Sequence, residues 1–175
     1  TDNESATHKI ASAVFFDHFL AMTKADIAAV PGAEHIQVCL DEWGWGHAGH
    51  TGALFFAAAI NAMHRAAPLV RIGSHAAVVN VDAVLDRVGN TVVRTSAFDI
   101  FRVFNTHHLP LSVEFEVTGE DALGVDVSAL TDPDSGETSV FVVNRTHHTL
   151  PLALSVEGVS ADAAVRIDTV AAATD

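Results

Sequence analysis

The sequence contains a single cysteine, Cys39, so its 175 residues cannot form an internal disulfide bond. Cys39 lies in an apolar run, and we expect a buried free thiol there, which agrees with a reducing compartment. Residues 1–4 carry neither the basic start nor the apolar block of a signal peptide. These absences predict a cytoplasmic location, and the missing initiator methionine leads us to expect a piece of a longer protein.

Basic residues are also scarce: 9 Lys and Arg stand against 22 Asp and Glu, and only Lys9 and Lys24 are lysines. The resulting net charge of −13 would repel nucleic acid and an anionic membrane surface, so neither is expected as a partner. No apolar stretch is long enough to cross a bilayer without interruption by charge or histidine. The hydrophobic fraction of 49 % is ample for a folded core and argues against disorder.

Apolar residues recur at helical spacing in the first half of the chain. They predict a helix that ends near Pro31, a second over residues 52–66 and a third over residues 96–105. Two short apolar runs between the helices, residues 36–40 and 69–72, predict buried strands. This alternation favours βα units with a parallel sheet, an α/β class. The face of the first helix that we expect to be buried consists of Ile10, Val14, Phe15, Phe19 and Met22.

From Pro110 onward the apolar period changes to two, which indicates strands with one buried and one solvated face. A turn is expected at residues 132–136, where Pro133 and Gly136 supply the required backbone angles. Short strands at this spacing are typical of an antiparallel β-sandwich, so the second half is expected to be all-β. The predicted strands cover residues 111–117, 125–129, 140–143, 150–156 and 165–170.

Asp41, Glu42 and Trp43 form the most informative cluster, because they follow directly on the apolar run 36–40. Barrels of alternating β-strands and α-helices place their chemistry at the carboxyl ends of parallel strands. Neighbouring strand residues point to opposite faces, so we expect one carboxylate to face the site and the other to brace the scaffold. Tryptophan beside a carboxylate suits a sugar, whose apolar ring face packs on indole. The alternative interpretation is a surface Asp-Glu pair beside core tryptophans.

A family resemblance rests on this cluster and two later stretches. Residues 36–43, Ile-Gln-Val-Cys-Leu-Asp-Glu-Trp, resemble the strand with the pattern F-D-E-W-N-V-W in family 51 α-L-arabinofuranosidases. Residues 76–81 are similar to the A-Q-L-V-N-V of that family, and residues 141–145 to its F-A-V-N-R, in the family's order. The resemblance implies that residues 1–108 are the C-terminal part of a (β/α)₈ catalytic barrel and that residues 109–175 form most of a β-sandwich domain, expected to be incomplete.

By the same resemblance, Glu42 is the nucleophile of a retaining glycosidase that hydrolyses terminal α-L-arabinofuranosyl groups. The implied partner is an arabinose-containing oligosaccharide or polysaccharide, no cofactor is needed, and the full-length protein is expected to be a homo-oligomer. Trp43, Trp45 and His47 are expected to contact the sugar. The acid/base glutamate of the family lies several strands upstream, before this chain begins. Glu34 is no substitute, because it precedes the strand and so lies toward the opposite rim.

Two positions depart from the family pattern. The tryptophan that follows the nucleophile by four residues in the family falls on Gly46, and the glutamine that touches the sugar falls on Ala77. The methyl group of Ala77 offers no side-chain hydrogen bond. These departures keep a second function class open, a non-catalytic sugar-binding or structural remnant of such an enzyme.

Eleven histidines raise the question of a metal site. They include His47 and His50 in one loop and the adjacent pairs 107–108 and 147–148. Zinc sites usually draw on spaced ligands with a carboxylate or thiolate partner, and Cys39 is expected deep in a strand. No metal is therefore expected, and solvated or site-lining histidines are the favoured interpretation. Residues 144–146 match the glycosylation pattern, but their strand context favours a structural role.

Overall fold

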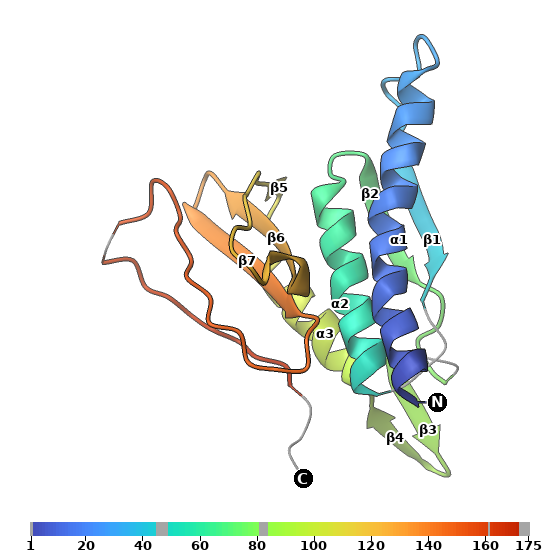
Figure 1. The fold of residues 1–175 in the computed structure, drawn as a ribbon. Helices are drawn as coiled ribbons and strands as arrows, with labels where there is room; N and C mark the ends of the chain where they lie inside the picture. The colour runs from blue at the N-terminus through green and yellow to red at the C-terminus, as the bar shows by residue number, and fades with distance from the viewer. Residues whose placement is uncertain (1, 45–48, 81–83, 161, 172–175) are drawn as a thin grey trace.

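The computed structural model describes residues 2–44, 49–80, 84–160 and 162–171, and it mixes helices with strands as expected (Figure 1). The helices are α1 (Asp2–Ala28), α2 (His50–Arg65) and α3 (Ser96–Thr106), and a 3-10 turn, η1, covers Ala122–Gly124. The strands are β1 (Val38–Trp43), β2 (Val70–His75), β3 (Leu85–Val88), β4 (Thr91–Arg94), β5 (Leu111–Ser112), β6 (Val125–Asp132) and β7 (Glu137–Asn144). Within the described ranges, no helix combines the length and the apolar character that crossing a membrane requires.

The first two strands, β1 and β2, run parallel, as the alternation of helices and strands predicted. Figure 1 shows α1 and α2 packed over one face of this pair, with α2 between α1 and the antiparallel sheet. Leu40 packs against the core under the helices, whereas Cys39 next to it is exposed. The expected burial of Cys39 is therefore wrong, because helices cover only one face of the pair in the described part of the chain.

The helix α2 is the centre of the core because it offers small side chains to its neighbours. Phe55 reaches Phe16 of α1, and Phe56 reaches Trp43 of β1, with ring centroids 6.3 and 5.9 Å apart. The helical layer and the parallel pair therefore share one core. The buried alanines of α2, whose methyl groups allow close approach of other elements, are Ala53, Ala57, Ala58, Ala59 and Ala62.

The helix α1 forms as predicted, but it buries a different face from the one expected. Ala13 and Leu20 are buried with Phe16 partly buried beside them, and Asp17 on the same face pairs with Arg65 of α2 at 2.7 Å. This spacing of three and four residues presents one stripe to α2 and turns the larger apolar stripe outward. The outward stripe, each residue at least 42 % exposed, contains Val14, Phe15, Phe19 and Met22.

The second half contains the antiparallel sheet β5–β6–β7. Each residue of β6 pairs with one of β7, from Val125 with Asn144 to Asp132 with Glu137, around the predicted turn. Gly136 closes that turn with φ of 72°, a conformation that favours glycine. The predicted strands on either side of the turn are thus confirmed, and both are longer than expected.

Two further strands expected in the second half do not form. Residues 150–156 and 165–170 carry no strand, and the strand expected over residues 111–117 is reduced to β5 and one more backbone bond, from Val113 N to Ala129 O at 2.9 Å. Alternation alone is not enough, because a strand needs a neighbour to accept its hydrogen bonds. A second sheet, which a sandwich requires, is absent from the described residues after Leu109, so the sandwich stays a prediction.

The parallel pair leaves backbone groups open, because β1 and β2 have no other strand partner among the described residues. Such edges seek partners, and the outward stripe of α1 adds exposed apolar surface. We expect the chain, expressed alone in reducing buffer, to self-associate as its concentration rises in sedimentation velocity. The Phe15→Glu variant keeps the open strand edge, so we expect it to self-associate still. If this variant no longer associated, the exposed stripe of α1 and not the strand edge would be the cause. A parent chain that stays monomeric would contradict the expectation.

Candidate active site around Glu42

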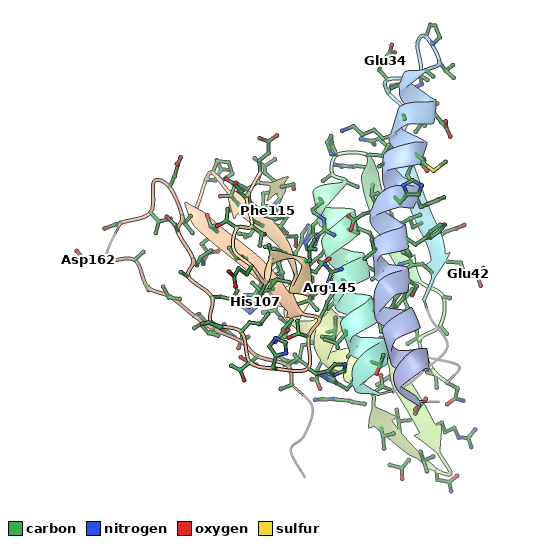
Figure 2. All side chains as sticks on the ribbon, in the orientation of Figure 1. Glu34, Glu42, His107, Phe115, Arg145 and Asp162 are labelled. Atoms are coloured by element: carbon green, nitrogen blue, oxygen red, sulfur yellow. The ribbon has the colours of Figure 1, made fainter. Side chains whose placement is uncertain are left out.

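Glu42 lies near the carboxyl end of β1, where the sequence predicted the nucleophile. Its side chain is exposed and points away from α1 and α2, on the side of the parallel pair that the helices leave open (Figure 2). No hydrogen bond or ion pair joins Glu42 to another residue within the described ranges. Glu34 lies at the other end of this layer, as expected for a residue before the strand. Glu42 is therefore open to a ligand, and Glu34 is not beside it.

An irregularity in β1 changes the expected directions of Asp41 and Glu42. Leu40 pairs with Gly73 and Trp43 pairs with His75, so two residues of β1 lie opposite a single residue of β2. This β-bulge directs both Leu40 and Trp43 to the helical layer and leaves Asp41 and Glu42 exposed between them. The expectation that Asp41 braces the scaffold is wrong, because Asp41 is exposed and makes no hydrogen bond to a described residue.

Trp43 lies in the core rather than at the surface expected for a sugar contact. It is 6 % exposed, and its indole meets the rings of Phe16, His75 and Phe101 with centroids 6.0, 5.8 and 5.8 Å away. These contacts anchor the end of β1 immediately after Glu42. Trp45 and His47, the other residues expected to contact the sugar, lie outside the described residues.

His75, at the carboxyl end of β2, was not singled out from the sequence. Its Nδ1 lies 2.7 Å from the carbonyl oxygen of Ala77 and 3.3 Å from the nitrogen of Ala77. The shorter contact indicates that Nδ1–H donates to the Ala77 carbonyl, so Nε2 carries the lone pair. Nε2 is buried and has no hydrogen-bond partner among the described residues. Ala77, whose side chain cannot form a hydrogen bond, thus holds His75 through its backbone.

Gly44 lies against His75 and determines how the chain leaves β1. Its φ is 149°, and a Cβ there would lie 2.8 Å from His75 Nε2. Both the backbone angle and the space exclude other residues. A glycine directly after Asp-Glu-Trp is the signal in the sequence that could have indicated this close approach.

We expect Gly44→Ala to lower the free energy of unfolding by about 3 kcal/mol, because it adds backbone strain and a clash with His75. Urea unfolding followed by circular dichroism measures the change. Gly136→Ala is the matched control: Gly136 also has positive φ, but nothing lies within 4 Å of its added Cβ. Its expected loss is about 1 kcal/mol. Equal losses in the two variants would contradict the close contact between Gly44 and His75.

The histidines form no metal site within the described ranges, where no group of three or more potential ligands occurs. His107 Nε2 lies 2.5 Å from Asp168 Oδ2 and joins the C-terminal segment to the end of α3. The hydrogen bond with His107 is the main cause that lowers the pKa of Asp168. Asn144 accepts hydrogen bonds from the backbone and hydroxyl of Thr146, which supports the structural interpretation of residues 144–146.

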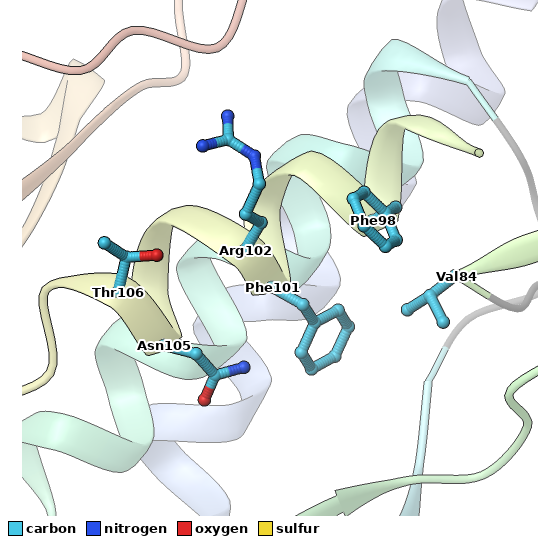
Figure 3. A pocket seen from close by; sticks show the side chains of 6 residues that line it. All are labelled: Val84, Phe98, Phe101, Arg102, Asn105 and Thr106. Carbon is cyan, nitrogen blue, oxygen red and sulfur yellow. The ribbon is translucent and has the colours of Figure 1, made fainter.

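A hollow of about 410 Å³ lies along α3, and Glu42 is not among the residues that line it (Figure 3). Its lining offers apolar rings and neutral or basic groups but no carboxylate, so it contains no group for glycosyl transfer. The residues that line it are Val84, Phe98, Phe101, Arg102, Asn105 and Thr106.

Comparison with known proteins places this geometry in a structural context. No protein-family model matches the sequence, and a search of curated proteins finds no similar sequence. Solved structures do share its fold. The α-L-arabinofuranosidase from Thermotoga maritima, solved as an arabinose complex, matches with a TM-score of 0.66 at 17 % identity, over 79 % of this chain and 35 % of the enzyme.

A family 51 α-L-arabinofuranosidase from Bifidobacterium longum matches with a TM-score of 0.61 at 18 % identity, over 78 % of this chain and 34 % of the enzyme. The chain thus spans about a third of the length of both enzymes. At these identities the likeness concerns the fold. The chain has the fold of part of a family 51 α-L-arabinofuranosidase, the family that its sequence motifs resemble.

Proposed function

We propose that this chain is the part of a retaining α-L-arabinofuranosidase that carries the nucleophile, Glu42. One observation supports this most: Glu42 projects from the carboxyl end of a parallel strand, on the face free of helices, in a fold shared with arabinofuranosidases. That end is where α/β barrels hold their catalytic groups. The proposal includes the domain division, with residues 1–108 as barrel elements and residues 109–175 as a sandwich domain.

The chemistry requires a carboxylate that a sugar can reach. Glu42 attacks the anomeric carbon, the bond to the leaving oxygen breaks, and an ester joins the sugar to Glu42 until water cleaves it. A second carboxyl group, about 5–5.5 Å away, must first protonate the leaving oxygen and then activate the water. The neighbouring strand, β2, has the sequence Val-Arg-Ile-Gly-Ser-His and supplies no carboxyl group. We therefore propose an acid/base residue upstream of this chain.

A substrate that needs no acid tests the nucleophile in this chain directly. Dinitrophenolate is a good leaving group without protonation, so 2,4-dinitrophenyl α-L-arabinofuranoside should transfer its sugar to Glu42 and then stall. We expect one equivalent of dinitrophenolate and a pentosyl adduct on the peptide that contains Glu42, detected by mass spectrometry. An adduct on Asp41 would refute the assignment of the nucleophile.

The second candidate is a non-catalytic sugar-binding or structural remnant. The burial of Trp43 favours it, because this tryptophan cannot stack on a sugar from the core. The replacement of a sugar-contacting glutamine by Ala77 acts in the same direction. The absence of any pentosyl adduct, together with binding of arabino-oligosaccharides in calorimetry, would favour this candidate over the enzyme.

A further inference from the structure

A chain of buried polar groups joins α2 to β6, far from Glu42. Asn61 Nδ2 donates to Asp126 Oδ1 at 2.8 Å, and the hydroxyl of Ser128 donates to Asn61 Oδ1 at 2.7 Å. His64 Nδ1 lies 3.0 Å from the same hydroxyl oxygen. Asn61 and Ser128 are fully buried, and His64 is 9 % exposed. These bonds cross the contact between the helical layer and the antiparallel sheet.

The direction of these hydrogen bonds fixes the protonation of His64. A serine hydroxyl has one hydrogen, and that of Ser128 is given to Asn61, so its oxygen can only accept from His64. Nδ1 of His64 therefore carries a hydrogen, and Nε2 carries the lone pair of a neutral ring. Any further proton must add at Nε2 and bring a positive charge into the contact.

The groups around His64 oppose that charge. Arg65 follows it on α2, and His108, after α3, has its ring centroid 5.5 Å away. The rings of Phe104 and Phe141 enclose it at 5.7 and 5.2 Å. Burial first, then His108 and Arg65, lower the pKa of His64 to about 4.

Asp126, the carboxylate at the end of this series of hydrogen bonds, cannot compensate a positive charge on His64. Asp126 is 6 % exposed, and Asn61 separates it from His64. Asp126 is already paired with Arg65 at 3.1 Å and with Arg145 at 3.6 Å. Arg65 in turn has its second partner in Asp17 of α1. Asp126 and Asp17 are thus both occupied by arginines, and no unpaired carboxylate is left for His64 among the described residues of this contact.

We propose that His64 is an acid-sensitive lock that holds the antiparallel sheet against α2 while neutral and releases it on gaining a proton. Release lets water reach the charged ring, which removes the burial and screens the repulsion by Arg65, the next residue on the same helix. The open form binds protons at the ordinary pKa of 6.5, and the closed form only near 4. Between these values the open form holds more protons, so the lock weakens as pH falls from about 6.5 and is fully weakened below about 4.

A thiol buried between α2 and the antiparallel sheet can measure how often the two separate. Leu130 on β6 is 2 % exposed, so Leu130→Cys should react with dithiodipyridine only when the sheet separates from α2. The exposed Cys39 in the same molecule provides the reference, and the ratio of the two rates removes the pH dependence of the reagent. We expect this ratio to rise by about 20-fold between pH 7 and pH 5, from the two pKa values of His64.

Two further variants isolate His64. In His64→Gln the amide can still donate to Ser128 but does not titrate, so the ratio should change little with pH. His18→Gln is the matched control, an exposed histidine on α1, and should keep the full rise. An equal rise in His64→Gln, or a loss of helical circular dichroism in parallel with labelling, would overturn the lock.

Nuclear magnetic resonance of the parent chain covers the case in which Leu130→Cys does not fold. The imidazole of His64 should remain neutral at pH 5.5 in the closed form, whereas a midpoint at the ordinary histidine value would overturn the proposal.

Discussion

Glu42→Gln is expected to reduce the release of dinitrophenolate from the activated arabinofuranoside by several orders of magnitude. The amide keeps the shape of the side chain but lacks the negative charge and cannot form the ester. Folding should change by less than about 0.5 kcal/mol, because the side chain is exposed and has no bonding partner among the described residues. Stopped-flow absorbance measures the rate, and urea unfolding the stability.

Two companion variants separate the nucleophile from its neighbour. Glu42→Gly should be as slow as Glu42→Gln but regain release when azide is added, because the small anion fills the vacated space and attacks the same carbon. Asp41→Asn removes the same charge from the adjacent exposed residue, and it should keep both the rate and the stability of the parent. Parental release in a well-folded Glu42→Gln chain would refute the proposed nucleophile and move the binding module to first place.

Asp126→Asn is expected to lower the free energy of unfolding by about 3 kcal/mol. The carboxylate is 6 % exposed and pairs with Arg65 and Arg145, whose side chains are 24 % and 17 % exposed. Among the described residues, an amide would leave Arg145 without a charged partner and Arg65 with Asp17 alone. Breaking a buried ion pair on one side costs more than the pair contributes, because the remaining charge stays buried. The free energy of unfolding, from urea titration at pH 7, measures the loss.

Asp99→Asn is the control for that experiment. Asp99 pairs with Arg102 at 3.4 Å on the surface of α3, where both side chains are nearly half exposed. Water and salt screen such a pair, so we expect a change of about 0.5 kcal/mol or less. If the two substitutions had equal effects, the ion pairs of Asp126 would not be the structural link between α2 and β6 that the contacts indicate.

Local patterns in the sequence predicted where the helices lie better than which side of each helix is buried. Apolar spacing located all three helices, but on α1 it selected the bulky stripe around Phe15 and Phe19, which lies outward. Ala13 and the ion pair of Asp17 decide which side meets α2, and both depend on the neighbouring helix. Burial of a helix face is a property of the partner as much as of the helix.

The hairpin β3–β4 was missed for a different reason. Val88 pairs with Thr91 across the two-residue turn Gly89-Asn90, and Gly89 has φ of 63°. Gly-Asn between short β-branched runs is a hairpin signal, and the irregular pattern before it obscured this one. In contrast, residues 150–156 alternate as strands do but have no partner to pair with in the described chain.

The candidate site was predicted in part. The motif around Glu42 located the carboxylate at the end of its strand, and the structure has it exposed there. The bulge that exposes Asp41 beside it depends on register with β2 and is invisible in one strand's sequence. The role of His75 and the series of hydrogen bonds that links His64 to Asp126 depend on contacts between residues distant in sequence. No spacing pattern encodes such contacts.

The alanines of α2 also have a mechanical consequence. Methyl groups cannot bend aside or adopt another rotamer, so they act as fixed spacers between α2 and the elements around it. A displacement of α2 at these alanines is therefore passed to the elements that they contact, and Phe56 on the same helix touches Trp43, the residue after Glu42. A single larger side chain on the buried face of α2 would in this way change the direction of a carboxylate that it never touches.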